Sequence, residues 1–287
     1  MVTPLLTTTL DATRSAVAAA RARGQRVGFV PTMGALHAGH LSLIRRARAE
    51  CGFVVVSIFV NPTQFGPHED LARYPRPFEK DLAACTAEAV DLIFNPTAEV
   101  VYPPFFKTFV EVTGLQNVLC GATRPGHFRG VATVVLKLFN IVQPDVAYFG
   151  QKDAQQARIL IQMVRDLHLS VEMVLCPIVR EADGLALSSR NVYLSTEQRQ
   201  QAPVLFQCLR MIQERIAAGD RLTEPLVQLA RARIWETPGA RLDYAAIVDF
   251  ERLEPIDVLS GKVLIALAVF FGATRLIDNI LVDVSPA

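Results

Sequence analysis

The sequence has little net charge, no paired cysteine motif and no long hydrophobic run. Its 29 basic and 28 acidic residues give a formal net charge of +1 over 287 residues. A chain that binds nucleic acid usually carries a clearly basic face or domain, so this balance predicts no nucleic acid partner. Any anion that the protein binds should therefore be held by a local site.

The cysteines and the apolar runs exclude further classes of protein. The five cysteines form no CxxC pair, which argues against a zinc ribbon or a thioredoxin motif. Cysteines scattered through apolar surroundings are typical of reduced core residues. The longest apolar run, residues 263–271, is far shorter than the roughly 20 residues of a membrane helix. The N-terminus shows no secretory signal pattern. We therefore expect a soluble, cytoplasmic protein without a membrane partner.

The first half of the chain alternates short β-rich runs with helical patterns. Strands are expected at 27–30, 53–60, 91–94, 145–150 and 171–179, and helices at 40–51, 78–90, 131–142 and 153–169. Repeated strand–loop–helix order is typical of α/β proteins with helices on both faces of the sheet. The sequence thus predicts a doubly wound, Rossmann-like parallel sheet.

The pattern changes after about residue 180. STEQ, residues 195–198, has the spacing of a capping box and predicts a long helix through Ile216. A second helix is expected at about 224–236, and strands of a small antiparallel sheet at 241–250, 263–271 and 275–282. We place a domain boundary near residues 178–184, with a larger domain at 1–180 and a smaller α+β domain at 181–287.

The segment PTMGALHAGHLSL, from Pro31 to Leu43, follows the first of these strands. The carboxyl ends of parallel strands and the N-termini of helices are suited to phosphate. Gly34 and Gly39 let the backbone approach a ligand closely. His37 and His40 are three residues apart, so both can donate hydrogen bonds to a departing pyrophosphate. The alternative is a helix-capping loop with one surface histidine and one buried, hydrogen-bonded histidine.

Other polar segments follow strands or lie between the domains. Their candidate residues are Gln64 in FVNPTQF, Arg129 in HFRG, Gly150, Lys152, Asp153 and Gln156 in FGQKDAQQ, and Ser188, Ser189 and Arg190 in LSSRN. Arginine and lysine suit phosphates or carboxylates. Simpler alternatives remain open: ordinary loops, a surface arginine at Arg129, and Asp153 as the N-cap of a helix.

These segments carry a resemblance to known enzymes. HAGH is similar to the HIGH signature of nucleotidylyltransferases and class I aminoacyl-tRNA synthetases, and LSSRN to their KMSKS loop. PTMGALHAGHLSL, FVNPTQF, YPR, GHFRGV, FGQKDAQQ and LSSRN, taken in order over residues 29–195, resemble the pantothenate synthetase (pantoate–β-alanine ligase) family. The resemblance implies a homodimer that condenses pantoate with β-alanine through a pantoyl adenylate, using ATP and Mg²⁺ and releasing AMP and pyrophosphate. It also implies that the domain at 1–180 binds ATP and pantoate and that the domain at 181–287 is a lid.

The resemblance also implies roles for individual residues. The catalytic set is His37, His40, Lys152, Ser188, Ser189 and Arg190, and the ATP site adds Pro31, Thr32, Met33, Gly34, Gly39, Gly150, Asp153, Val179 and Leu187. Gln64 and Gln156 would bind pantoate, and Asp81 would lie near magnesium. The family often has an acidic residue before that aspartate, where this chain has Lys80. The usual MSSRN reads LSSRN here.

Two other functions are compatible with parts of this pattern. A nucleotidylyltransferase acting on a phosphorylated alcohol would share the HAGH turn, but the paired glutamines suit a hydroxy acid better than a phosphate. A nucleotide-sensing module would bind ATP without chemistry, yet the histidine pair, the lysine and the SSRN loop are all intact. A class I synthetase would need a larger chain and a more basic surface.

Overall fold

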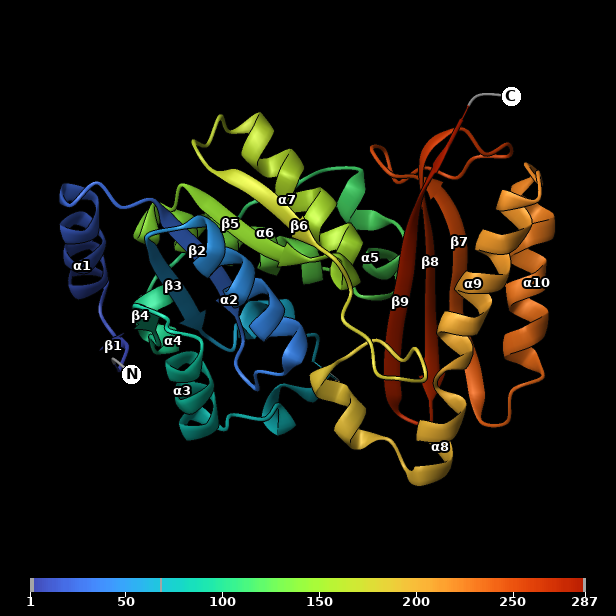
Figure 1. The fold of residues 1–287 in the computed structure, drawn as a ribbon, viewed down its shortest axis with the longest axis horizontal. Coiled ribbons are helices and arrows are strands. Elements are labelled where there is room, and N and C mark those ends of the chain that lie inside the picture. The colour runs from blue at the N-terminus through green and yellow to red at the C-terminus, as the bar shows by residue number, and fades with distance from the viewer. Residues whose placement is uncertain (1–2, 68, 286–287) are drawn as a thin grey trace. The chain divides into compact units, whose positions relative to one another are not determined.

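The computed structural model describes residues 3–67 and 69–285, which are drawn in colour in Figure 1. The chain divides into two compact units. The first comprises Met1–Asn117, Gly121–Gly150 and Ile159–Pro177, and the second comprises Val118–Cys120, Gln151–Arg158 and Ile178–Ala287. The expected roles of residues 1–180 as a binding domain and of 181–287 as a lid domain stay predictions.

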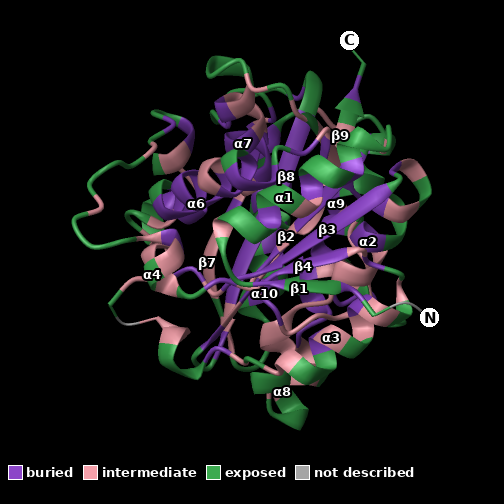
Figure 2. Ribbon diagram, turned by 90° about the vertical axis from the view of Figure 1, so that its left-hand side faces the viewer, coloured by how far each residue is buried: buried purple, intermediate pink, exposed green. Residues whose placement is uncertain are grey.

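The first unit is built around a six-stranded parallel sheet with the order β1–β4–β3–β2–β5–β6. The strands are β1 Leu5–Thr7, β2 Val27–Thr32, β3 Phe53–Ile58, β4 Leu92–Phe94, β5 Val146–Gly150 and β6 Glu172–Cys176. β3 is buried along its whole length, as the purple ribbon in Figure 2 shows. Strands covered on both faces read as continuous apolar runs, which is why the sequence located strands such as β2 and β3. β1 was not expected.

Helices cover both faces of this sheet, as expected for the doubly wound class. The helices that begin before Pro177 are α1 Leu10–Ala22, α2 Ala38–Glu50, α3 Phe78–Ala87, α4 Ala98–Val101, α5 Cys120–Thr123, α6 His127–Val142 and α7 Ala154–Asp166. Ile44 of α2 and Cys85 of α3 share one core cluster with Val30. Phe29, on the opposite face of β2, packs edge-on against Phe139 of α6, with ring centroids 6.4 Å apart.

The second unit contains a three-stranded antiparallel sheet of β7 Ala240–Asp249, β8 Gly261–Phe271 and β9 Thr274–Val284. Helices α9 Val204–Ala217 and α10 Thr223–Trp235 contribute to the same core as this sheet, through side chains such as Leu209 and Ile265. The predicted small sheet is therefore confirmed.

Several predicted boundaries were wrong. The long helix expected through Ile216 is two helices, α8 Thr196–Gln201 and α9, because Pro203 has no backbone N–H to continue the first. The capping box of Ser195 and Gln198 is present as expected. Helix α1 was not expected; Thr9 caps it by accepting a hydrogen bond from the backbone N–H of Ala12.

The strand order defines where a ligand should bind. From β2 the chain adds β3 and β4 on one side, and it later adds β5 and β6 on the other. The crevice at such a reversal, beyond the carboxyl ends of the strands, is the usual ligand site of open α/β sheets. β2 ends at Thr32 and β5 at Gly150, so two of the predicted segments begin at the reversal.

Candidate active site

The loop after β2 carries the histidine pair. It leaves the strand at Thr32 and reaches α2 through Gly34 and Ala35, whose φ angles of 81° and 51° lie in the left-handed region. A Cβ atom at Gly34 would lie 2.9 Å from a carboxylate oxygen of Asp81. Glycine is therefore required at this position both for the backbone conformation and for the close approach of Asp81.

His37 and His40 lie together at the N-terminus of α2, with ring centroids 4.1 Å apart. Nδ1 of His37 accepts a hydrogen bond from the N–H of Gly39 at 3.1 Å, and Nδ1 of His40 accepts one from the N–H of His37 at 3.3 Å. The two histidines thus form a capping box. A ring nitrogen that accepts an N–H bond carries no proton, so each neutral ring holds its proton on Nε2.

This arrangement combines two readings that the sequence left as alternatives. The histidines do cap a helix, but with one nitrogen each, and the tautomer so fixed makes Nε2 a hydrogen-bond donor. Donors beside a helix N-terminus suit a phosphate. The role of the pair in binding ATP stays a prediction.

Asp81 binds the backbone of the same loop. Its two carboxylate oxygens accept the backbone N–H groups of Ala35 at 2.9 Å and of Leu36 at 2.7 Å. The residue is 2% exposed. Burial raises the pKa of Asp81 above its ordinary value, and the two backbone hydrogen bonds oppose that rise. Sequence reasoning missed this loop-holding role, because Asp81 and its partners are distant in the chain.

The surroundings of Asp81 offer little to a magnesium ion. Both oxygens serve the loop, and residues 3–67 and 69–285 contain no group of three or more His, Cys, Asp or Glu side chains that could hold a metal. Mg²⁺ favours octahedral oxygen sites with several waters. Mg²⁺ is commonly bound through only one or two protein carboxylates together with substrate phosphates, and the role of Asp81 near magnesium stays a prediction.

Gln64 lies against the loop after β2. It ends the short 3₁₀ turn η1, Pro62–Gln64, and its Nε2 contacts the sulfur of Met33 at 3.1 Å. Asn61 donates to Oε1 of Gln64 at 3.1 Å and to the carbonyl of Gly130 at 3.2 Å. Asn61 is buried and was not among the predicted residues, although a polar residue directly after an apolar strand could have suggested it.

The glycine of HFRG explains the close packing at this point. A Cβ atom on Gly130 would lie 2.3 Å from the carbonyl oxygen of Thr63 in η1. Arg129, by contrast, pairs with Glu111 at 3.3 Å and lies over the ring of Phe109 at 3.9 Å. These protein partners hold its guanidinium at the surface, and the role of Arg129 toward a ligand stays open.

A cavity of about 370 Å³ lies beside Met33 in the first unit. Phe59, Val60 and Phe78 give it apolar walls, and Arg76 of the YPR segment and Asp81 add charge. A cavity with apolar walls and few polar groups suits a small organic ligand. The predicted loop, the YPR segment and Asp81 are thus brought to one place.

An ion pair stabilises the segment that carries Gln64. Arg124 donates to both carboxylate oxygens of Glu69, at 2.7 and 2.6 Å, and to the carbonyl of Gln64 at 3.4 Å. A ring nitrogen of His127 lies 2.8 Å from the same carbonyl. Burial opposes the charge of Glu69, but its bonds to Arg124 outweigh burial, so the pKa of Glu69 lies below its ordinary value of 4.5.

This ion pair gives a pH-dependent prediction for Glu69→Gln. The variant should lose about 1–2 kcal/mol of unfolding free energy at pH 7, because a charged bidentate pair is replaced by a neutral contact. Because the pKa of Glu69 is lower in the folded protein than its ordinary value of 4.5, the ionised side chain stabilises the fold at pH values above 4.5. This stabilisation is lost as the pH falls. The difference from wild type in urea unfolding should therefore shrink below pH 4.5. An equal difference at pH 7 and pH 4 would contradict this assignment.

The other predicted residues lie in the second unit. Lys152 and Asp153 belong to the 3₁₀ turn η4, Gln151–Asp153, which directly precedes α7. Asp153 ends this turn and directly precedes Ala154, the first residue of α7, so its role as a helix cap stays a prediction. Ser188 caps η5, Ser189–Tyr193, by accepting the N–H of Arg190 at 3.2 Å. The carbonyl of Val179 accepts the N–H of Leu187 at 3.0 Å.

The predicted site residues thus divide between the two units. The first holds Pro31, Thr32, Met33, Gly34, His37, Gly39, His40, Gln64, Asp81 and Gly150, and the second holds Lys152, Asp153, Gln156, Val179, Leu187, Ser188, Ser189 and Arg190. Within the first unit the structure gathers the histidines, Met33, Gln64 and Asp81 around one loop. Their roles toward ligands stay predictions.

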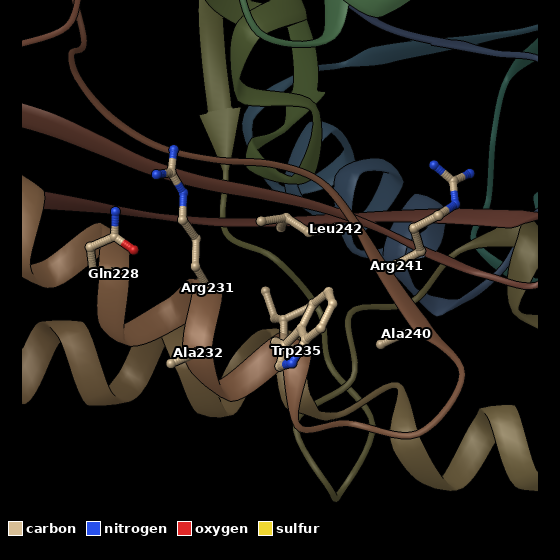
Figure 3. A pocket seen from close by; sticks show the side chains of 8 residues that line it. Gln228, Arg231, Ala232, Trp235, Ala240, Arg241 and Leu242 are labelled. Carbon is tan, nitrogen blue, oxygen red and sulfur yellow. The ribbon is translucent and has the colours of Figure 1, made fainter.

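A second cavity, of about 480 Å³, lies between α10 and β7 and contains none of these residues. Figure 3 shows the guanidinium groups of Arg231 and Arg241 pointing away from the ring of Trp235, so their charges do not converge. This cavity therefore lacks the arrangement of a phosphate site.

Comparison with known proteins identifies the family. The profile described as pantoate-beta-alanine ligase matches residues 5–281. The chain belongs to the pantoate–β-alanine ligase family. It is 54% identical to the pantothenate synthetase of Moorella thermoacetica over 96% of this chain and 98% of that one. It is 57% identical to that of Thermotoga petrophila over 90% and 92%.

Solved structures of this ligase family share the fold. The crystal structure of pantothenate synthetase from Thermus thermophilus has a TM-score of 0.92 and 48% identity, and covers 98% of this chain and 100% of its own. The pantoate-beta-alanine ligase of Francisella tularensis, complexed with β-γ ATP and β-alanine, has a TM-score of 0.75 and 35% identity, covering 97% of both chains. Across residues 3–67 and 69–285, no helix is both long enough and apolar enough to cross a membrane.

Proposed function

We propose that this ligase joins pantoate to β-alanine in two steps, through a pantoyl adenylate, at the expense of ATP. Membership of the family supports the reaction, and one observation about this chain carries the mechanism. His37 and His40 stand at the N-terminus of α2 with both Nδ1 atoms engaged by backbone N–H groups, so that Nε2 is the donor of each ring. Such donors favour charge on a leaving pyrophosphate.

In the first step, a carboxylate oxygen of pantoate attacks the α-phosphorus of ATP. The bond from that phosphorus to the bridging oxygen of the β-phosphate breaks, and pyrophosphate leaves with the electron pair. Lys152, Ser188, Ser189 and Arg190 bind the phosphates together with the histidines. Little covalent participation is needed, because positioning and charge stabilisation carry such transfers.

The remaining assignments complete this nucleotide site. The backbone around Pro31, Thr32, Met33, Gly34 and Gly39 and the residues Gly150, Asp153, Val179 and Leu187 line ATP. Any magnesium would be held chiefly by the triphosphate, since Mg²⁺ is commonly bound through substrate phosphates. It would neutralise phosphate charge.

In the second step, the free amine of β-alanine attacks the acyl carbon of the adenylate. The new C–N bond forms, AMP leaves, and the amine gives up its proton to solvent. The mixed anhydride reacts with water, so a cover over the site is needed. We assign this cover to the LSSRN loop and the C-terminal region. A homodimer and a cytoplasmic location are part of the same proposal.

Gln64 and Gln156 are proposed to hold the hydroxyl and carboxylate groups of pantoate. Replacing Gln64 by alanine is expected to raise the KM for pantoate about tenfold or more, because a lost substrate hydrogen bond costs about 1.5 kcal/mol. The KM for ATP should change little. Gln213→Ala, an exposed glutamine of α9, is the matched control. A pantoate KM equal to that of the control would contradict the assignment.

The assay that tests the reaction is exchange of labelled pyrophosphate into ATP, with pantoate present and β-alanine absent. Pantoate-dependent exchange is the result expected for adenylation of a carboxylate. A stable dinucleotide product would instead identify a nucleotidylyltransferase that uses a phosphorylated alcohol. Binding of ATP with no exchange would identify a sensor.

A further inference from the structure

Asn279 of β9 is buried and all its side-chain hydrogen bonds go to the turn that carries Lys152. Its Nδ2 donates to the carbonyl of Gln151 at 3.0 Å and to the carbonyl of Lys152 at 2.9 Å. Its Oδ1 accepts from Nε2 of Gln151 at 3.4 Å. The residue is 4% exposed. One amide group thus fixes two successive peptide units of η4.

The turn needs such support because of its length. η4 comprises only Gln151–Asp153 and lies between the end of β5 and the start of α7. A 3₁₀ turn of this length has poor hydrogen-bond geometry and little stability of its own. A rotation of the peptide plane at Lys152 would move the long side chain and its ammonium group. Contacts from outside the turn therefore set where the charge lies.

Asn279 is itself held on a rigid element. It pairs with Ala266 in the middle of the β8–β9 ladder. Its backbone N–H donates to Oδ1 of Asp278 at 2.8 Å. Asp278 in turn binds the guanidinium of Arg180 through both oxygens, at 2.6 and 2.9 Å. Side chains alternate along a strand, so Asp278 faces the core of the unit while Asn279 faces the turn.

The charge of Lys152 interacts with Asp278, the neighbour of Asn279 on β9. Burial raises the pKa of Asp278 above its ordinary value, and Arg180 and the charge of Lys152 oppose that rise. The lysine therefore lies close enough to this part of β9 for the two charges to interact.

We propose that Asn279 is a positioning residue for Lys152, which makes the C-terminal sheet the support of a phosphate-binding lysine. This inference rests on the proposed function of Lys152. It assigns Asn279 no contact with substrate. It places the lysine in the same unit as Ser188, Ser189 and Arg190, so any displacement of that unit would carry these phosphate-binding residues together.

The test is a double-mutant cycle in the full-length protein, read by pantoate-dependent pyrophosphate exchange. Asn279→Ala is expected to lower the maximal exchange rate about ten- to a hundredfold, because a misplacement of about 1 Å has an effect of that size. The KM for pantoate should stay unchanged, since no pantoate contact is altered. In a Lys152→Ala background, Asn279→Ala should lower the rate less than about twofold, because interacting residues are not additive.

Gln151→Ala is the matched control. It removes only the 3.4 Å contact to Oδ1 and keeps both bonds from Asn279 to the backbone. Its exchange rate should remain within about twofold of wild type. If Asn279→Ala does not fold, as judged by thermal unfolding, Asn279→Asp replaces it, because aspartate has the same shape but no donor for the two carbonyls.

The outcomes separate this inference from the function on which it rests. If Lys152→Ala alone leaves exchange unchanged, the proposed role of the lysine fails and the positioning role fails with it. If Lys152→Ala lowers exchange but the effect of Asn279→Ala is the same in both backgrounds, only the positioning role is overturned. An unchanged rate in folded Asn279→Ala would overturn it as well.

Discussion

Replacing His40 by asparagine is expected to lower pantoate-dependent pyrophosphate exchange by about 10²- to 10³-fold, the effect of removing one preorganised donor to developing charge. The Nε2 donor is lost, while the asparagine oxygen can still accept the N–H of His37, as Nδ1 of His40 does at 3.3 Å. The helix cap should therefore survive, and the free energy of unfolding should change by no more than about 1 kcal/mol.

His168→Asn is the matched control for this experiment. His168 is exposed after α7 and has a φ of 51°, a conformation that asparagine tolerates. The control should exchange like the wild type. Equal rates in the two variants would show that the histidine at the start of α2 serves the fold alone, and the proposed adenylation mechanism would lose its main support.

Replacing Arg180 by methionine is expected to lower the free energy of unfolding by about 3–5 kcal/mol, since it leaves a buried carboxylate without its partner. Asp278 is only 2% exposed in its side chain, and Arg180 binds it through two hydrogen bonds. A second substitution, Asp278→Asn, should restore much of the lost stability, because it removes the unpaired charge. Urea unfolding at pH 7 measures both effects.

Arg199→Met provides the comparison for Arg180→Met. Arg199 also binds two carboxylates, Glu181 at 2.7 Å and Asp183 at 2.6 Å, but its side chain is 30% exposed. A surface pair is worth about 0–1 kcal/mol, so this variant should be nearly as stable as wild type. Similar losses of unfolding free energy in Arg180→Met and Arg199→Met would contradict the claim that burial makes the Arg180–Asp278 pair the more important one.

The pH dependence of Arg180→Met has a definite sign. Burial raises the folded pKa of Asp278 above its ordinary value of 3.8, even against Arg180. A carboxyl group whose pKa is raised in the folded protein stabilises the fold at pH values below its ordinary pKa. This stabilisation is lost as the pH rises through the pKa of the folded state. Without Arg180 the folded pKa should rise further. The variant should therefore be closest to wild type at acidic pH and furthest from it at pH 7.

The core of the fold could be predicted because its elements show clear local sequence patterns. Phe53–Ile58 is an apolar run buried at every position, and Ser195 and Gln198 form the capping box that their spacing indicates. Short or atypical elements could not be found in this way. β1, Leu5–Thr7, has too few residues to show a period, and Pro203 interrupted a helix whose apolar pattern continued past it.

The candidate site shows the same limit. His37 and His40 were found because two histidines three residues apart, in a loop with Gly34 and Gly39 directly after a strand, are unusual. Their use as a capping box was not foreseen, since histidine is not a common cap residue. Asp81 lies 45 residues from Leu36 and Asn279 lies 127 residues from Lys152. Contacts over such separations depend on the tertiary structure and cannot be recognised from a short stretch of sequence.

The route of the chain between the two units limits how this ligase can be recombined. The second unit takes Val118–Cys120 and Gln151–Arg158 from within the sequence of the first. A protein divided after residue 180 would separate the Lys152 turn from the Asn279 amide that binds it. The C-terminal region is therefore not a cassette that can be exchanged between homologues at a single crossover. Chimeras would need to transfer residues 118–120 and 151–158 with it to keep matched partners.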